Sequence, residues 1–258
     1  SLLDENLPRI APNIPQGSDV VSIGIEDGRE ERMLLEALNE RECSRFYVVA
    51  PGDRAREKAA EAVGDLSVEV RTVNAGMEDL HELERGWNVP ALVSMLRCRF
   101  VDCNPEWLIP VVSKMAGEGG LFLFDCRLWT TGSAVCSGRD HRPIPAWMRR
   151  AFRGHGIEPD DCELVVRLSP HKTPWGEICK VDRRVRIGET ADKELGRAAV
   201  DTEPLETIRL GTTYRYSGYQ LERYLWQYGF GIEELAMCEE HEHALVLARK
   251  TPRNRTTD

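Results

Sequence analysis

The stretch that decides the fold is residues 20–38, which read VVSIGIEDGREERMLLEAL. Residues 20–25 are a short apolar run rich in β-branched side chains, and a turn containing Gly24 and Gly28 follows. Residues 29–41 then place Met and Leu side chains at helical spacing. The stretch therefore predicts a strand, a glycine-containing turn and an amphipathic helix, which is how a βαβ fold begins.

Further apolar runs follow along the first half of the chain. We expect strands at 46–50, 68–73, 91–96 and 119–125, and helices at 107–115 and at 53–63, the latter with Asp53 as its N-cap. Continuous apolar runs are typical of parallel strands that are buried on both faces. Parallel sheets bind ligands beyond the carboxyl ends of their strands, near the switch point after the first strand. The candidate ligand site therefore comprises residues 22–29, 50–53, 74–79 and 96–105.

The pattern changes after residue 128. Residues 129–160 are rich in Gly, Pro and Arg, with one expected helix at 146–152. Residues 162–168 and 176–188 alternate apolar with polar side chains, which predicts an antiparallel hairpin with a long loop. We therefore expect residues 129–204 to form an inserted, smaller α+β lobe that covers the carboxyl edge of the sheet.

The α/β pattern returns near the C-terminus, with a predicted helix at 216–230 and an antiparallel strand pair at 232–240 and 243–250. The predicted fold class is thus α/β. A Rossmann-like domain with a mostly parallel sheet and an antiparallel C-terminal strand pair is expected at 1–128 and 205–250, followed by a tail at 251–258. Residues 1–19 contain three prolines and no evident apolar period, which predicts an irregular lead-in arm.

Charge and cysteine content restrict the function class. The formal net charge of −9 disfavours general binding to nucleic-acid phosphates. No apolar stretch of about 18 residues is present, so we expect no membrane span, and the first residues lack the features of a secretory signal. The eight cysteines are scattered without a CxxC pair, which favours free thiols in a cytoplasmic protein over a zinc site or a disulfide framework.

The C-terminal segments carry a more specific signal. Residues 211–230 read GTTYRYSGYQLERYLWQYGF, and residues 232–250 read IEELAMCEEHEHALVLARK. Together they resemble the end of the histidine-specific Nα-methyltransferases of ergothioneine biosynthesis, a family of class I S-adenosylmethionine (SAM) methyltransferases. Residues 22–38 are similar to that family's first loop and helix, and residues 91–105, ALVSMLRCRFVDCNP, to its fourth strand and the following turn.

The resemblance implies SAM as cofactor and assigns roles to residues. The expected cofactor-binding positions are Ser22, Gly24, Glu26, Gly28, Ala50, Asn74 and Ala75. The expected substrate-binding positions are Asp102, Gly211, Thr213 and Tyr216, of which Asp102 and Tyr216 are also the candidate catalytic residues. Arg215 and Ser217 match the same C-terminal motif.

The sequence departs from the family at several of these positions. Ser22 replaces the leading acid of the cofactor loop, and Glu26 replaces its middle glycine. Ala50 stands where the family carries the acid that binds the ribose hydroxyls, and its side chain accepts no hydrogen bond. Gly211 and Asp102 replace the Glu and Asn that bind histidine, so we do not expect histidine to be the substrate.

Several candidate residues have a simpler explanation as well. Tyr214, Tyr216 and Tyr219 either present a hydroxyl to a small-molecule pocket or are core aromatics beside a helix. His241 and His243 are expected in a solvated hairpin turn, because a metal site needs more ligands, and we expect no metal. His141, His155 and His171 are each either a general base or a surface histidine. The arginine-rich residues 139–155 form either a solvated helix face or a basic patch that attracts an acidic ligand or partner.

Two hypotheses of different classes follow. The first is a SAM-dependent methyltransferase that acts on a small amine or amino-acid-like substrate. The second is a catalytically inactive domain of the same fold that serves as a binding or regulatory subunit, and aminocarboxypropyl transfer from SAM is a third alternative. In each case we expect a small-molecule ligand, no nucleic acid and no membrane, with a protein partner or a homodimer as a further possibility.

Overall fold

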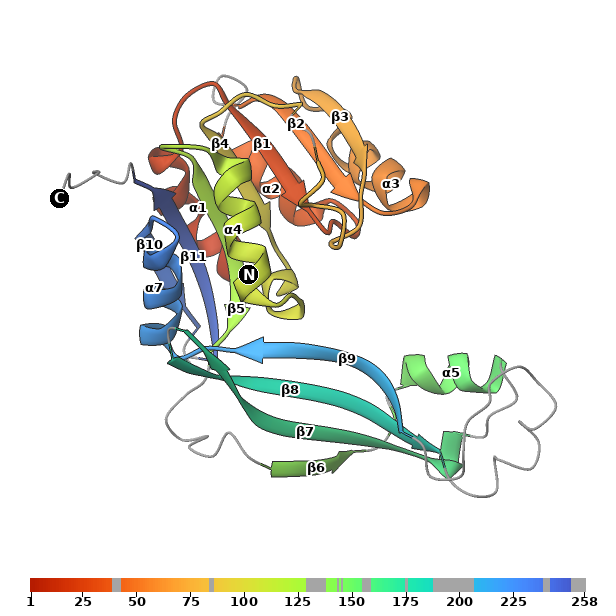
Figure 1. Cartoon of the computed structure of the whole chain (residues 1–258). Helices are drawn as coiled ribbons and strands as arrows, with labels where there is room; N and C mark the ends of the chain where they lie inside the picture. The colour runs from red at the N-terminus through yellow and green to blue at the C-terminus, as the bar shows by residue number, and fades with distance from the viewer. Residues whose placement is uncertain are drawn as a thin grey trace. The chain divides into compact units, whose positions relative to one another are not determined.

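The computed structural model describes residues 1–38, 43–83, 86–128, 138–142, 144, 146–154, 159–174, 176–187, 207–238 and 242–251. The chain divides into two compact units. Figure 1 shows the whole chain, coloured from red at the N-terminus to blue at the C-terminus. The first unit comprises Ser1–Thr130, Pro174–Gly176 and Tyr216–Asp258, and the second comprises Thr131–Thr173 and Glu177–Arg215.

The first unit is built on a seven-stranded sheet with the strand order β10-β11-β5-β4-β1-β2-β3. Its strands are β1 (Ser18–Ile23), β2 (Cys43–Ala50), β3 (Glu69–Asn74), β4 (Ala91–Met95), β5 (Leu121–Arg127), β10 (Phe230–Met237) and β11 (His243–Lys250). The strands from β5 to β3 pair in parallel, whereas β11 is antiparallel to both of its neighbours, β5 and β10. The predicted fold class, a mostly parallel Rossmann-like sheet with an antiparallel C-terminal pair, is confirmed.

The switch point of this sheet lies at β1. The chain moves from β1 outward to β2 and β3, then returns to the other side of β1 to form β4 and β5. The segments after β1 and after β4 therefore leave the sheet side by side at its carboxyl edge, where open α/β sheets bind ligands. This arrangement places residues 24–28 next to residues 96–104.

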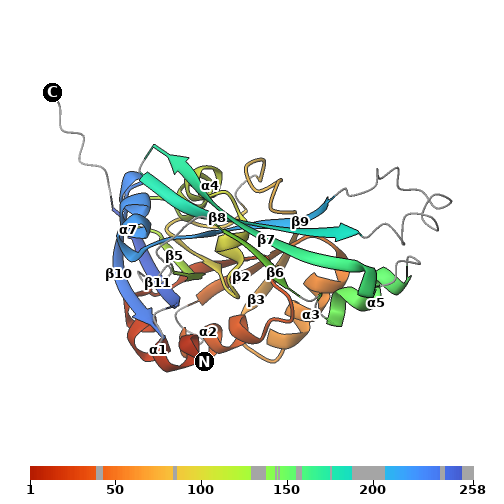
Figure 2. The same cartoon turned by 90° about the horizontal axis from the view of Figure 1, so that it is seen from below.

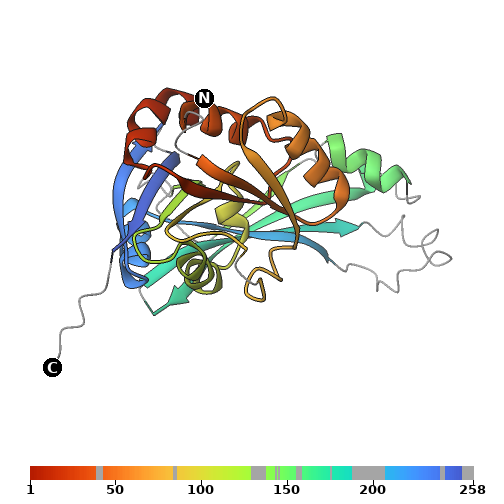
Figure 3. The same cartoon turned by 90° about the horizontal axis from the view of Figure 1, so that it is seen from above.

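Helices cover both faces of the sheet, which explains why every residue of β1 and β4 is buried. Figures 2 and 3 show α1 (Leu2–Ile10), α2 (Arg29–Leu38) and α3 (Asp53–Val63) on one face, and α4 (Pro105–Ala116) and α7 (Gly218–Gln227) on the other. The alternation along β5 matches these layers. Leu121 and Leu123 belong to the aliphatic core with α1, α2 and α3, whereas Phe122 and Phe124 join an aromatic cluster with Phe100.

The N-terminal segment corrects one prediction. Residues 2–10 form helix α1 rather than an irregular arm. Leu3, Leu7 and Ile10 share one face and are buried in the aliphatic core. The repeat spans little more than two turns and includes Pro8, so the period was too short to recognise, and packing against the sheet stabilises the helix.

The second unit is a four-stranded sheet with the order β6-β7-β8-β9. Its strands are β6 (Gly138–Arg142), β7 (Cys162–Thr173), β8 (Gly176–Ile187) and β9 (Thr207–Arg215), and helix α5 (Ala146–Gly154) belongs to the same unit. The two strands of the predicted hairpin are present, and β7 is longer than expected. Strands β6 and β9 were not predicted, and β9 belongs to this unit although we expected residues after 204 in the main domain.

Two further findings concern the sequence predictions. Residues 189–204, as well as His155 and His241, lie outside the described residues. Across the ranges that the structure describes, no helix is both long and apolar enough to span a membrane.

Candidate active site at the carboxyl edge of the sheet

The turn after β1 is shaped by Gly24. Its φ is +74°, a conformation that L side chains rarely adopt, and its N–H donates to the carbonyl of Val49 on β2 at 3.0 Å. A Cβ at this position would lie 3.0 Å from Cε of Met77 and 3.4 Å from Cγ of Arg99. The space directly over the turn is thus lined by two flexible side chains of the chain itself.

Gly28 has a close packing contact that the sequence did not indicate. Its φ is also +74°, but a Cβ there would lie 2.8 Å from Cβ of Ala62 and 3.0 Å from Cα of Ala59, both on α3. Glycine at position 28 therefore lets the start of α2 pack closely against α3. Packing between helices requires this glycine, and its role in cofactor binding stays a prediction.

Ser22 is fully buried and contacts an acid that the sequence analysis overlooked. Its hydroxyl donates to Oε1 of Glu31 at 3.0 Å, and Glu31 is itself buried in the first turn of α2. Burial raises the pKa of the Glu31 carboxyl above its ordinary value, although the hydrogen bond from Ser22 opposes the shift. A carboxyl group thus stands beside Ser22, at the end of β1, but it comes from helix α2.

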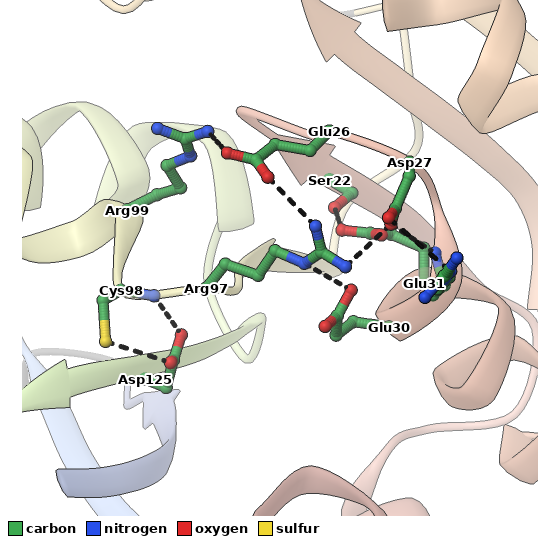
Figure 4. A network of polar contacts seen from close by, with 10 residues as sticks. Ser22, Glu26, Asp27, Glu30, Glu31, Arg97, Cys98, Arg99 and Asp125 are labelled. Atoms are coloured by element: carbon green, nitrogen blue, oxygen red, sulfur yellow. Dashed lines mark hydrogen bonds and ion pairs between the residues drawn. The ribbon is translucent and has the colours of Figure 1, made fainter. Parts of the chain in front are cut away.

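Arg97, in the loop after β4, holds the β1–α2 turn in place. Its guanidinium donates to Glu26 at 3.0 Å, to Asp27 at 2.7 Å and to Glu30 at 2.7 Å, and Figure 4 shows these carboxylates around it. Arg99 also pairs with Glu26. Single exposed ion pairs contribute little to stability, but here one side chain joins three carboxylates, so the two segments at the switch point form one network.

The loop that carries Arg97 is strained. Arg97 has a φ of +63° and Cys98 a φ of +57°, and for residues with a Cβ this conformation costs about 1–2 kcal/mol each. Asp125 on β5 compensates, because it accepts the Cys98 N–H at 2.8 Å and the Cys98 thiol at 3.3 Å. Strain of this kind collects at functional sites, where surrounding contacts hold a particular geometry.

Asp53 is the first acidic residue after β2, and its side chain is exposed to solvent rather than turned toward the carboxyl edge of the sheet. Ala50 is almost fully buried, and its carbonyl accepts a hydrogen bond from Arg56, which also donates to Oδ1 of Asn74 at 2.6 Å. Asp53 pairs with the same arginine while its side chain is 84% exposed. It is the first residue of α3 and not its cap, because Gly52 occupies the N-cap position. Ala75 is buried beyond the end of β3.

The candidate acceptor-binding residues do not all share one environment. Asp102 ends a 3₁₀ turn, Arg99–Asp102, half-exposed and 3.7 Å from the Arg99 guanidinium. Tyr216 is completely buried, with its ring centroid 5.4 Å from that of Phe100 and 6.1 Å from that of Tyr224. Gly211 and Thr213 are on β9 in the second unit, where Thr213 is buried and Gly211 has open space beside it.

A cavity that the sequence analysis did not anticipate opens beside Arg97. Its volume is about 300 Å³, and its polar lining includes Glu30, Arg97, Asp125 and His243. Nδ1 of His243 lies 3.7 Å from the Cys98 sulfur. The signal in the sequence was Asp125 itself, a carboxylate within the apolar run LFLFDCRL, but only the antiparallel pairing of β11 with β5 brings His243 to it.

The cysteines and histidines of this region do not form a metal centre. Within the described ranges, no three His, Cys, Asp or Glu side chains are arranged to hold a metal ion. Burial, together with the charge of Asp125, raises the pKa of the Cys98 thiol to about 12. Cys98 therefore stays protonated and acts as a hydrogen-bond donor rather than as a nucleophile.

Comparisons with known proteins identify the fold. No protein-family model matches the sequence, and no curated protein does. Among solved structures, an S-adenosylmethionine-dependent methyltransferase from Clostridium acetobutylicum matches with a TM-score of 0.54 at 12% identity, over 97% of this chain and 91% of that chain. The sugar N-methyltransferase KedS8 from Streptoalloteichus matches with a TM-score of 0.51 at 11% identity, over 98% and 88%. The pyocyanin biosynthetic protein PhzM matches with a TM-score of 0.51 at 13% identity, over 97% and 55%. The chain therefore has the fold of the class I SAM-dependent methyltransferases.

Proposed function

We propose that this chain transfers a methyl group from SAM to a small amine or amino-acid-like acceptor. The observation that carries the proposal is the turn after β1. It lies at the switch point of a methyltransferase-type sheet, and Gly24 leaves its backbone without a side chain where a ligand would contact it. When bound, SAM supplies a methyl group on a positively charged sulfur, so the protein mainly positions the acceptor and excludes water.

The residues around the turn fit one end of SAM better than the other. Glu26 and Arg99 are charged groups of opposite sign at the turn, which suits the amino and carboxylate groups of the methionine part. Met77 and Arg99 must move aside, and both are flexible side chains. At the end of β2, however, Ala50 offers no carboxylate for the ribose hydroxyls, and Asp53 is engaged with Arg56.

This mismatch supports a second candidate function, a catalytically inactive domain that serves as a binding or regulatory subunit. A charged hydrogen bond contributes about 1.5–3 kcal/mol, so the loss of the ribose acid alone would weaken SAM binding by about tenfold or more. The ion pairs of Glu26 with Arg97 and Arg99 must also open to admit a ligand at the turn. The two candidates differ in whether SAM binds at all.

The acceptor class is part of the proposal. KedS8 is by name a sugar N-methyltransferase, and a nitrogen on a small molecule is the acceptor that we propose here as well. Histidine is not proposed, because Gly211 and Asp102 replace the residues that bind it in the family that the sequence resembles. We further propose a cytoplasmic location, and a homodimer or a protein partner remains part of the hypothesis.

The deciding experiment is calorimetric titration with SAM and with S-adenosylhomocysteine. Wild-type protein should bind both, and Gly24→Val should abolish binding because its side chain fills the space over the turn. Gly17→Val is the matched control. Gly17 precedes β1, has a φ of +76°, and a Cβ there would meet only the Ser44 hydroxyl at 3.6 Å, so the backbone strain is similar but the site is remote.

Each outcome has a distinct meaning. If wild type shows no heat up to about millimolar ligand, methyl transfer is refuted and the inactive binding domain is the better description. If Gly24→Val binds as well as wild type and the control, SAM binds somewhere other than at this turn.

A further inference from the structure

The cavity beside Arg97 has the features of a small-molecule site. Its floor is apolar, formed by Leu3, Leu96 and Leu245, all of which are buried. Its polar lining also includes Ser1, Glu30 and Arg97, and two of its polar side chains, Asp125 and His243, come from neighbouring strands of the sheet. Cavities that bind small molecules are mostly apolar with a few converging polar groups, and a volume of about 300 Å³ is at the lower end of their range.

The charges around the cavity favour a cation. The Arg97 guanidinium is neutralised by Glu26, Asp27 and Glu30. Asp125, in contrast, has no ion pair with any Lys, Arg or His in the described part of the chain, and the Cys98 N–H and thiol are its hydrogen-bond donors. A carboxylate held in a partly apolar cavity by neutral donors is a counter-ion for an incoming positive charge.

The protonation behaviour of Asp125 supports the same conclusion. Burial raises the pKa of its carboxyl above the ordinary value, against the hydrogen bonds from Cys98 and the charge of the neighbouring His243 imidazole. An ammonium group that enters the cavity would favour the charged carboxylate and reverse that shift. The strained Arg97–Cys98 segment keeps the carboxylate in place before any ligand arrives, because both oxygens of Asp125 are fixed by Cys98.

We infer that this cavity binds a small ammonium compound with an apolar body, with the carboxylate of Asp125 as counter-ion and the imidazole of His243 as a second polar contact. The identification of this compound as the methyl acceptor rests on the proposed function. The binding site itself does not, since its residues are separate from Gly24 and Ala50.

The test uses benzylamine as the probe, with benzyl alcohol as the neutral compound of similar shape and benzoate as the anionic one. Titrations are followed by NMR of the imidazole groups and by calorimetry, without SAM. We expect benzylamine to bind at least about tenfold more tightly than benzyl alcohol, since a charged hydrogen bond is involved. Benzylamine should shift the NMR signals of His243 and leave those of His81 unchanged, because His81 does not line this cavity.

Asp125→Asn keeps the size of the side chain and should remove the preference for the amine. Glu61→Gln, on the exposed surface of α3, is the control and should retain it. The inference is overturned if benzylamine and benzyl alcohol bind equally, if benzoate binds best, or if no probe binds at about 10 mM. It is also overturned if the preference survives in Asp125→Asn. Because the His243 shift is measured on wild type, a failure of the variant to fold does not leave the question open.

The outcome is separable from that of the SAM titration. Amine binding without SAM binding would refute methyl transfer and keep the cavity as a ligand site. SAM binding without amine binding would keep the cofactor site and place the acceptor elsewhere.

Discussion

At the scale of the residue, the carboxyl edge of the sheet is organised by two consecutive left-handed residues. Arg97 and Cys98 follow β4, and each contacts a different part of the site. Arg97 holds the β1–α2 turn through its three carboxylates, whereas Cys98 holds Asp125 beside the new cavity. The β1–α2 turn and the cavity are therefore connected through adjacent residues, and these contacts offset the cost of the backbone conformation of Arg97 and Cys98.

A second residue-scale feature is the buried carboxyl of Glu31, which leads to a prediction about pH. Because burial raises the pKa of the Glu31 carboxyl above its ordinary value of 4.5 in the folded state, the folded protein binds more protons than the unfolded chain as the pH rises past that value. Its contribution to stability is therefore complete below pH about 4.5 and is lost as pH rises through the folded-state pKa. Glu31→Gln cannot ionise at this position. Its free energy of unfolding relative to that of wild type should therefore increase as the pH is raised from about 4 to about 8.

Urea unfolding of both proteins at several pH values measures this difference. Glu36→Gln is a suitable control, since Glu36 is an exposed residue of the same helix. Parallel stability curves for wild type and Glu31→Gln would show that Glu31 does not ionise differently in the folded protein.

At the scale of the element, helix α1 illustrates how a short apolar repeat gains its stability from packing. Leu7 lies in the middle of the buried face, in the core shared with α2 and the sheet. Replacing Leu7 with Ala should cost about 2–5 kcal/mol, because the packed side chain leaves a cavity. Glu5→Ala in the same helix should cost little, since Glu5 is exposed. Denaturant midpoints of the two variants measure the contrast, and equal midpoints would mean that α1 does not pack on the sheet in solution.

Strand β5 also shows that tertiary packing decides the role of a side chain. The alternation of Leu121 and Leu123 with Phe122 and Phe124 assigns the two faces of β5 to different cores. The aromatic core also contains Tyr216 and Tyr224, which accounts for the burial of Tyr216 beside α7. The ring of Tyr216 is therefore part of the aromatic core, while its role in binding an acceptor stays a prediction.

At the scale of the whole molecule, the fold is that of the SAM-dependent methyltransferases. On the proposed function, the ribose of SAM would lie at the end of β2, where Ala50 offers no carboxylate. This leads to a prediction about Ala50→Asp. The new carboxylate should tighten SAM binding by about tenfold or more, since it adds a charged acceptor worth about 1.5–3 kcal/mol. Arg56, which already donates to the carbonyl of Ala50, can compensate its charge.

Calorimetry of wild type and Ala50→Asp with SAM tests this expectation, with circular dichroism to check that the variant is folded. Asp53→Asn serves as the comparison, because Asp53 is highly exposed and should not affect binding. Unchanged or weaker binding by folded Ala50→Asp would mean that the ribose of SAM does not lie at the end of β2.

The sequence by itself determined the class of fold. Apolar runs separated by amphipathic helices are a local property, so the strands of the parallel sheet, the C-terminal strand pair and the switch point could be read from residue spacing. The glycine turn was found in the same way, since Gly24 is required by backbone conformation. Helix α1 and strand β6 were missed because their patterns are short and their stability depends on tertiary packing. Strand β9 was missed because its sequence, TIRLGTTYR, contains a glycine and few apolar side chains.

What the tertiary structure decided is which side chains meet. Glu31 reaches Ser22 from a helix, Arg97 reaches three acids from another loop, and His243 comes to Asp125 through the pairing of β11 with β5. Such contacts join residues far apart in the chain, and they depend on register and on the direction of each side chain, neither of which a linear pattern contains. For the same physical reason the close approach of Gly28 to α3 and the cavity beside Arg97 became visible only once the chain was folded.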